Sequence, residues 1–278
     1  MPAPPKMLFL ALVLVGCVSQ RRAGLDGWSL LELRNYPAAL AAFESELSTH
    51  ERAELFAGRA RALHLLGRNV EAAADYAEAV RREPQVAQWR IGQGIVLLAL
   101  GDFAGAVSAC DEALRIDPSL AKGYLNRGIA RERAGDGAGA LADYTRAVEA
   151  QPRFAAAHNS RGVALARAGR IDEAIDDFST AAAIEPALAR AHANLGAAHY
   201  ARGDTKQAFI SLNTAIRIDR GDPLAYANRA RVYLDLGDAE QALVDLERAV
   251  ALAATDEELR ALLAAARADA AAGRTPLD

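Results

Sequence analysis

The chain has 278 residues and a formal net charge of −4, and its composition is 52% hydrophobic, 24% charged and only 6% aromatic. An apolar fraction of this size can bury a core, which excludes an intrinsically disordered chain. The small negative charge provides no electrostatic footprint for nucleic acid. Two cysteines are too few for a disulfide framework or a thiolate zinc site. Because alanine dominates the hydrophobic residues, the composition favours closely packed helices over a β-rich fold.

The N-terminal residues are predicted to be an export signal instead of part of the fold. Lys6 precedes an uncharged run, residues 7–16. As a helix this run would span about 15 Å, half of the hydrocarbon core of a membrane. A cation followed by a short apolar run is typical of a secretory signal. The alternatives are a buried N-terminal strand or an ordinary signal peptide without lipid.

The end of this run, Leu14-Val15-Gly16-Cys17, resembles the bacterial lipobox. The resemblance implies that residues 1–16 are a lipoprotein signal peptide, that cleavage precedes Cys17, and that the Cys17 thiol carries a diacylglycerol. Several acyl chains, palmitate among them, would then hold the protein firmly on a membrane, whereas one chain holds only marginally. No aspartate follows Cys17, which favours the outer membrane over the inner one. Residues 17–27 are expected to form a flexible tether.

The remainder of the chain repeats with a period of 34 residues. Small residues recur in register, which is the mark of a repeat architecture. One column of glycines and two columns of alanines keep this step through six successive repeats: Gly67, Gly101, Gly135, Gly169, Gly203 and Gly237; Ala72, Ala106, Ala140, Ala174, Ala208 and Ala242; Ala79, Ala113, Ala147, Ala181, Ala215 and Ala249.

These columns resemble the tetratricopeptide repeat, whose motif places glycine at position 15, alanine at positions 20 and 27, an aromatic residue at 24 and proline at 32. The resemblance implies an all-α fold: a helix-turn-helix solenoid wound as a right-handed superhelix, with a C-terminal capping helix. The expected domains are a repeat array over 28–256 and a capping helix with a tail over 257–278. Within the array we expect a degenerate repeat at about 20–52 and then full repeats at 53–86, 87–120, 121–154, 155–188, 189–222 and 223–256.

The columns also have a physical explanation. Position 15 lies just past the first helix, where glycine adopts a left-handed conformation without a Cβ clash. The aspartates that follow four of these glycines are expected to cap the second helix: Asp102, Asp136, Asp204 and Asp238. Thr255 and Glu258 form a capping-box pattern that predicts a last helix over about 256–272. Its face Leu259, Leu262, Leu263 and Ala266 is expected to seal the open end of the array.

Arginine and aspartate vary together between repeats. Position 7 is arginine in four repeats, and position 23 is aspartate in the same four. In the other two repeats both residues are absent. Because position 7 lies on the first helix and position 23 on the second, we expect bidentate ion pairs that clamp the two helices together: Arg59 with Asp75, Arg127 with Asp143, Arg161 with Asp177, and Arg229 with Asp245.

The sequence offers no residue that we would nominate for catalysis. Three of the five histidines, His158, His192 and His199, occupy usual packing positions, and no pair shows a metal-ligand pattern. Cys110 occupies a core position and is expected to be an inert buried thiol. Each repeated glycine ends a helix instead of following a strand, so no phosphate-binding loop is predicted. We therefore expect neither an enzyme nor a metal or other cofactor.

The surface most suited to function is the concave groove, which the family lines from the first helix of each repeat. An asparagine recurs there, and its amide can both donate and accept hydrogen bonds to an extended peptide. Nearby basic side chains could hold carboxylates. Ile91, Ile95 and Leu98 are expected to add an apolar patch. The groove residues are predicted to be Lys122, Asn126, Arg133, Asn159, Arg167, Arg190, Asn194, Asn228 and Arg231.

Together these observations predict a lipid-anchored periplasmic scaffold or adaptor that binds a protein or peptide partner of the cell envelope through its groove. Lipoproteins of this layout serve in pilus or secretin assembly or recruit cell-wall enzymes. One alternative is a self-associating lipoprotein that forms homo-oligomers through its terminal repeats. Another is a cytoplasmic adaptor whose N-terminus only imitates a signal.

Overall fold

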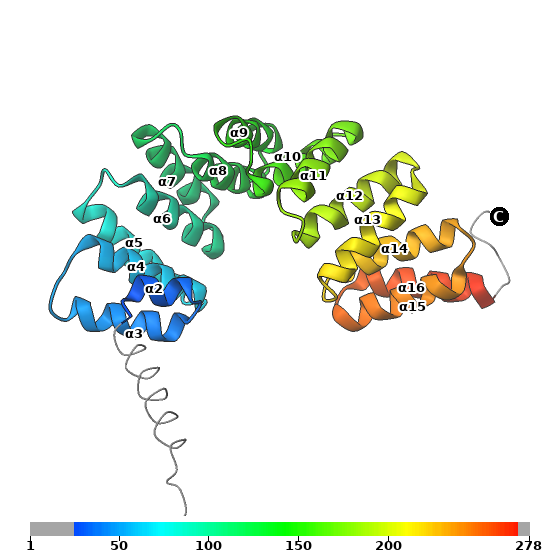
Figure 1. The fold of residues 1–278 in the computed structure, drawn as a ribbon, viewed down its shortest axis with the longest axis horizontal. Helices are drawn as coiled ribbons and strands as arrows, with labels where there is room; N and C mark the ends of the chain where they lie inside the picture. The colour runs from blue at the N-terminus through cyan, green and yellow to red at the C-terminus, as the bar shows by residue number, and fades with distance from the viewer. Residues whose placement is uncertain (1–24, 272–278) are drawn as a thin grey trace, which may run out of the picture. The chain divides into compact units, whose positions relative to one another are not determined.

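The computed structural model describes residues 25–271, which divide into two compact units, one ending at Ala134 and the other beginning at Gly135. The predicted signal peptide, Cys17, most of the predicted tether and the tail 272–278 lie outside the described residues. The described residues form fifteen α-helices and no strand, labelled as in Figure 1. The predicted all-α solenoid of helix pairs is therefore confirmed.

Unit 1 contains three helix pairs and the first helix of a fourth. Its helices are α2 (Gly27–Glu32), α3 (Tyr36–Leu47), α4 (Ala53–Leu65), α5 (Asn69–Arg82), α6 (Ala87–Leu100), α7 (Phe103–Ile116) and α8 (Ala121–Arg133). Each helix packs on the next one along the chain, and the first helices α4, α6 and α8 also pack on one another in sequence. The array in this unit is therefore built from nearest-neighbour contacts.

Unit 2 continues with the second helix of the fourth pair and ends with a single unpaired helix. Its helices are α9 (Gly137–Ala150), α10 (Ala155–Arg167), α11 (Ile171–Ile184), α12 (Ala189–Arg202), α13 (Thr205–Ile218), α14 (Pro223–Asp235), α15 (Ala239–Leu252) and α16 (Glu257–Ala271). The six full repeats expected from the 34-residue period start at the first residues of α4, α6, α8, α10, α12 and α14.

The turn inside each repeat uses a left-handed residue. The six glycines of position 15 have φ between 77° and 90°. In the turns described, this residue and the next donate backbone N–H bonds to carbonyls three and five residues earlier, as Gly169 does to Ala166 and Arg170 to Leu165. The degenerate first repeat lacks the glycine, and Arg34 takes its place with φ 57° and the same bonds. The turn is kept there in spite of the side chain.

Aspartate side chains cap the N-termini of the second helices as expected, with one exception. The carboxylates of Asp102, Asp136 and Asp238 accept backbone N–H bonds three residues later, at 2.8–3.1 Å. The prediction for Asp204 is wrong, because its side chain makes no capping bond. Arg202 and His199 draw the Asp204 carboxylate away from the helix end.

The small residues of the repeat form the core. The alanines of positions 20 and 27 are buried throughout, with relative exposures of 0–1%. The larger residues of position 24 are buried beside them: Phe43, Tyr76, Cys110, Tyr144, Phe178, Leu212 and Leu246. Small side chains let the helix axes approach closely, and the residue at position 24 fills the space between the paired helices.

The last helix covers the end of the array. Leu263 and Ala266 of α16 are buried against Ala230 and Leu246, and Leu262 is partly buried in the same cluster. The residue that starts α16 differs from the expected Thr255. Asp256 accepts a hydrogen bond from the backbone N–H of Leu259 at 3.1 Å, because its carboxylate is one residue closer to the first turn.

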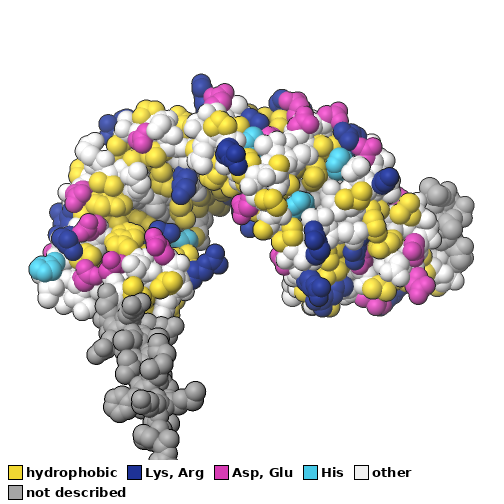
Figure 2. All heavy atoms as spheres, viewed as in Figure 1, with side chains coloured by type: hydrophobic (Ala, Val, Ile, Leu, Met, Phe, Trp, Pro, Cys, Tyr) yellow, Lys and Arg dark blue, Asp and Glu magenta, His cyan; other side chains and the backbone are white. Residues whose placement is uncertain are grey.

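The surface of each unit is of mixed charge. On the face shown in Figure 2, basic and acidic side chains are scattered among apolar and neutral ones in both units. Many belong to pairs within one helix, such as Arg81 with Glu78 and Arg146 with Glu149. No helix within residues 25–271 has the length and apolar character needed to cross a membrane.

Candidate functional site

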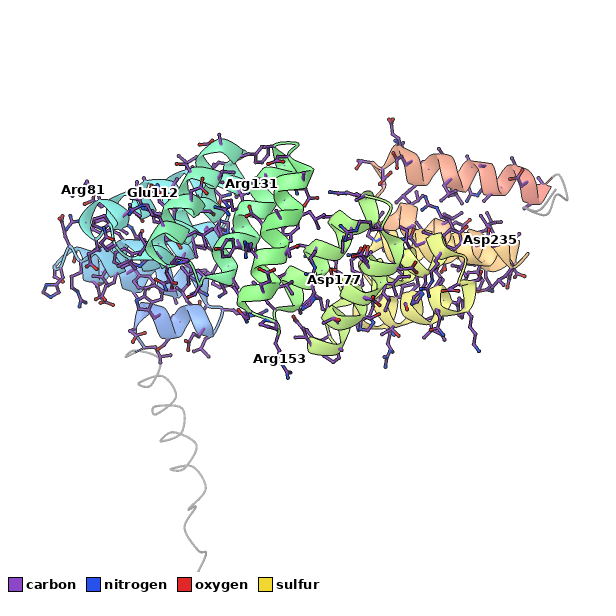
Figure 3. The ribbon with its side chains drawn as sticks, turned by 90° about the horizontal axis from the view of Figure 1, so that it is seen from above. Arg81, Glu112, Arg131, Arg153, Asp177 and Asp235 are labelled. Atoms are coloured by element: carbon purple, nitrogen blue, oxygen red, sulfur yellow. The ribbon has the colours of Figure 1, made fainter. Side chains whose placement is uncertain are left out.

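Three of the four expected ion pairs form with the same geometry. In each, arginine Nε donates to Oδ2 of the aspartate at 2.7 Å and Nη2 donates to Oδ1 at 2.7 Å. The aspartates are buried, with 7% exposure for Asp75, 4% for Asp177 and 3% for Asp245. Figure 3 shows Asp177 among the helices of unit 2, whereas Arg153 projects outward from the loop before α10. Each pair ties the first helix of a repeat to the second.

The pairing raises the pKa of the arginine in each pair. The pKa values of Arg59, Arg161 and Arg229 are raised, chiefly because each guanidinium donates hydrogen bonds to its aspartate. Burial acts in the opposite direction as the second cause. A charge of this kind is tolerated inside the fold only with its partner in place.

The fourth expected pair has one member in each unit, with Arg127 in unit 1 and Asp143 in unit 2, and it stays a prediction. Within unit 1, Arg127 Nη1 donates to Asp111 Oδ1 at 2.5 Å. Arg229 makes the equivalent bond in unit 2, from Nη1 to Asn213 Oδ1 at 2.5 Å. Both acceptors lie sixteen residues before the arginine, on the second helix of the preceding repeat. Arg229 therefore links successive repeats as well as the two helices of its own repeat, and Arg127 links its own helix to the preceding repeat.

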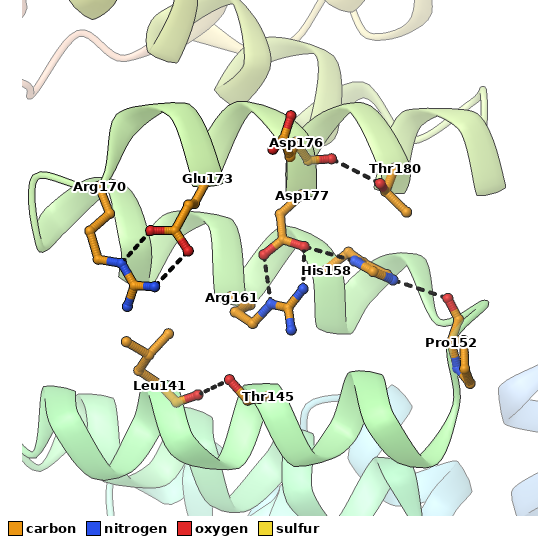
Figure 4. Close-up of polar contacts among 10 residues, drawn as sticks. All are labelled: Leu141, Thr145, Pro152, His158, Arg161, Arg170, Glu173, Asp176, Asp177 and Thr180. Carbon is orange, nitrogen blue, oxygen red and sulfur yellow. Dashed lines mark hydrogen bonds and ion pairs between the residues drawn. The ribbon is translucent and has the colours of Figure 1, made fainter.

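Two histidines are buried in polar surroundings. His158 Nδ1 lies 2.9 Å from Asp177 Oδ1, and its Nε2 lies 3.0 Å from the carbonyl oxygen of Pro152 (Figure 4). The pKa of His199 is lowered, first by burial and then by the nearby Arg202 guanidinium. Both histidines occupy packing positions, and the Cys110 side chain is buried in the core. Within residues 25–271, no three histidine, cysteine or acidic side chains are grouped so that they could hold a metal ion.

The predicted groove residues of unit 2 lie on its first helices, α10, α12 and α14, which follow one another in contact. Asn194 Nδ2 donates to Asn159 Oδ1 at 2.9 Å, so the asparagines of two successive repeats are joined. Arg231 Nη1 donates to Asn228 Oδ1 at 3.1 Å. These bonds leave the Asn194 oxygen and the Asn228 amide nitrogen without a partner among the described residues.

A pocket of 430 Å³ brings three of these residues together. Arg190, Asn194 and Asn228 line it together with Leu188, Leu224, Ala189, Ala193, Asp219 and Asp222. The helix starts of α12 and α14 and the loop between α13 and α14 supply these side chains. The pocket therefore combines an apolar lining with one cation, two carboxylates and two amides. Such a surface suits a peptide segment with a polar backbone and mixed side chains.

The other predicted groove residues are placed differently. Lys122, Asn126 and Arg133 lie on α8 in unit 1, where Asn126 Nδ2 donates to the Lys122 carbonyl oxygen at 2.8 Å. Arg167 is exposed at the end of α10. The predicted apolar patch is wrong at Ile91, which is only 6% exposed and packs in the core against Ala87 and Ala113.

Sequence reasoning missed the acidic side of the pocket. Asp219 and Asp222 belong to a loop rather than a repeated helical position. Their carboxylates accept backbone N–H bonds from Gly221 and Leu224 at 2.8 and 2.9 Å, which shapes the loop beside Asn228. The available signal was the break in the proline column, where Arg220 stands and Pro223 follows three residues later.

Comparison with known families identifies the repeat along most of the chain. A family model described as tetratricopeptide repeat matches residues 26–84, 66–121 and 125–189. Two further models with the same description match residues 165–232 and 224–256. The sequence has no significant match among curated proteins.

Solved structures share the fold at low sequence identity. The APC/C hetero-tetramer Cut9–Hcn1 is 20% identical with a TM-score of 0.78, over 86% of this chain and 48% of that one. The chain thus spans about half the length of that relative. A tetratricopeptide repeat protein from Parabacteroides merdae ATCC 43184 is 14% identical with a TM-score of 0.65, over 87% of this chain and 96% of that one. YrrB, described as a TPR protein with an unusual peptide-binding site, is 24% identical with a TM-score of 0.50, over 66% and 95%.

Proposed function

Because the chain belongs to the tetratricopeptide repeat family, we propose that it is a non-enzymatic scaffold that binds another protein through the first helices of its repeats. The observation that carries this proposal is the pocket of 430 Å³ in unit 2, where Arg190, Asn194 and Asn228 come together. These residues come from two successive repeats, so a segment bound there would contact α12 and α14 together.

The chemistry of the pocket favours an extended segment of a partner protein. The carbonyl oxygen of Asn194 can accept a backbone N–H, and the amide nitrogen of Asn228 can donate to a backbone C=O. Leu188 and the exposed Leu224 offer contact to an apolar side chain. Arg190 can hold an acidic group of the same segment.

The test compares two double variants of the full chain. In Arg190→Ala with Asn228→Ala, we expect loss of partner capture by photo-crosslinking from a residue beside the pocket, with unchanged helicity. Lys206→Ala with Gln207→Ala alters two exposed residues of α13 outside the pocket and serves as the matched control. Equal capture by both variants would reject the pocket as the binding surface. Loss of capture in both would also reject it, since the effect would not be specific.

We further propose that the scaffold is a lipoprotein of the bacterial cell envelope, facing the periplasm. The support is the sequence alone: the short apolar run 7–16 followed by Cys17. Metabolic palmitate labelling and membrane fractionation of wild type and Cys17→Ala test it. Label on the wild type only, with the variant released or unprocessed, is the expected result. An unlabelled, full-length and soluble wild type would instead favour a cytoplasmic adaptor.

A further inference from the structure

A second pocket, of 320 Å³, lies in unit 2 away from the predicted groove residues. Leu141 and Thr145 of α9 form one side, and Asp176 of α11 belongs to the other. Between them, α10 contributes Arg161 and Leu165. None of these residues lines the pocket assigned above to partner binding.

Arg161 has a free hydrogen-bond donor at this pocket. Its Nε and Nη2 are taken by Asp177, but its Nη1 donates no hydrogen bond to any residue that the structure describes. The side chain is 24% exposed, and solvent reaches this nitrogen at the pocket. In Figure 4, Asp177 lies on one side of the guanidinium, and the helix that carries Leu141 and Thr145 lies on the opposite side.

Two other repeats show what such a nitrogen binds. Arg127 Nη1 bonds to Asp111 Oδ1, and Arg229 Nη1 bonds to Asn213 Oδ1, in each case sixteen residues earlier in the chain. The residue sixteen before Arg161 is Thr145. Its hydroxyl is committed to the Leu141 carbonyl oxygen, to which it donates at 2.9 Å. The Thr145 oxygen keeps its acceptor lone pairs, but it accepts no hydrogen bond from Arg161, so the bond between repeats that Asp111 and Asn213 provide is missing at this junction of the described residues.

The charges around the pocket decide between a carboxylate and a carboxamide. Arg161 neutralises Asp177, and Arg170 neutralises Glu173 through bonds of 2.7 and 2.6 Å. The carboxylate of Asp176 makes no ion pair within residues 25–271. The pocket therefore carries an excess negative charge, which disfavours an incoming carboxylate. A carboxamide is neutral, and its two groups can accept from Arg161 and donate to Asp176.

We propose that this pocket binds the carboxamide side chain of a glutamine or asparagine presented by a partner protein. The carboxamide oxygen takes the place that Asn213 Oδ1 occupies beside Arg229. Leu141 and Leu165 contact the methylene stem of the inserted side chain. The chain thereby gains a contact surface that is separate from the pocket between α12 and α14.

The experiment uses the full chain and follows the Nε–Hε resonance of Arg161 by NMR. It is titrated with the peptide acetyl-Ala-Gln-Ala-amide and with the matched peptides that carry Glu or Ala at the centre. We expect a saturable shift with the Gln peptide and at least about tenfold weaker binding of the other two. No saturable shift, or Glu or Ala peptides that bind as tightly as the Gln peptide, would contradict the proposal.

Two variants at residue 145 sharpen the test. Thr145→Asn supplies an internal carboxamide like that of Asn213 and is expected to abolish binding of the Gln peptide. Thr145→Val keeps the size of the side chain and leaves Arg161 Nη1 open, so binding should persist. Retained binding in Thr145→Asn, or its loss in Thr145→Val with native helicity, would overturn the assignment. Arg190→Ala with Asn228→Ala should leave this titration unchanged, which separates it from the proposed partner site.

Discussion

At the scale of single residues, the repeated arginine and aspartate show how buried charge is tolerated in an alanine-rich solenoid. Asp245 is almost fully enclosed, and Arg229 satisfies both of its carboxylate oxygens while a third nitrogen reaches Asn213. The ion pair holds two helices of one repeat, and the third bond holds the preceding repeat. A hydrophobic pair could replace the attraction between the two helices, but it would lack the directional hydrogen bonds of the ion pair.

Arg229→Leu is expected to lower the free energy of unfolding by about 3–5 kcal/mol, because Asp245 is left buried and unpaired. The double variant Arg229→Leu with Asp245→Leu should recover much of that loss. Urea denaturation of both singles and the double gives the coupling energy. A double variant no more stable than Arg229→Leu would contradict the pairing argument. The same cycle for Arg127 and Asp143 would test the fourth predicted pair.

Arg34→Gly is expected to stabilise the chain by about 1 kcal/mol, because a left-handed conformation costs a non-glycine residue about 1–2 kcal/mol. Gly169→Ala is the matched control, since it places a Cβ at φ 77° in the corresponding turn, and it should destabilise by a similar amount. Thermal denaturation measures both. A fall in stability for Arg34→Gly would show that the Arg34 side chain makes a contribution larger than the backbone strain.

At the scale of helices, Gly196 sets the distance between α12 and α13, the two helices of one repeat. A Cβ on Gly196 of α12 would lie 2.6 Å from Leu212 Cγ and 3.1 Å from the Ala208 carbonyl oxygen on α13. The backbone oxygen cannot move without displacing its helix. Glycine is therefore kept here although alanine is the better helix former.

Gly196→Ala is expected to destabilise the protein by about 1–3 kcal/mol through overpacking, against the gain in helix propensity. Gly137→Ala in the first turn of α9 provides the control, because a Cβ there meets no atom within 4 Å. Gly137→Ala should be neutral or stabilising. Denaturant titrations measure both variants. A Gly196→Ala variant more stable than the wild type would show that the two helices separate at little cost.

At the scale of the whole molecule, stability is expected to be a sum of neighbouring contacts within each unit. Each helix contacts mainly the next helices along the chain. A destabilising substitution in one repeat is therefore expected to affect mainly the helices next to it. The capping helix α16 illustrates such local dependence, because its Leu263 is buried against the last repeat of the array.

Leu263→Ala is expected to cost about 2–5 kcal/mol locally, by removing buried side-chain contact at the end of unit 2. Hydrogen exchange should show lost protection in α14, α15 and α16 and no change in α4 to α7. Leu236→Ala, which alters an exposed leucine of the same unit, should leave protection unchanged. Uniform loss of protection along the chain would mean that the array unfolds as one cooperative body.

The sequence by itself determined the fold class, the repeat, the start of each full helix pair and the pairing of Arg59, Arg161 and Arg229 with their aspartates. A 34-residue period places the same residue type at the same point of every repeat. Each column therefore indicates which kind of residue the structure requires at that point. Only the tertiary structure decided what breaks the period. It showed Arg34 in the glycine turn, Asp204 turned toward Arg202, and Asp219 and Asp222 beside Asn228. These outcomes depend on contacts between side chains of different elements, and no local pattern records such contacts.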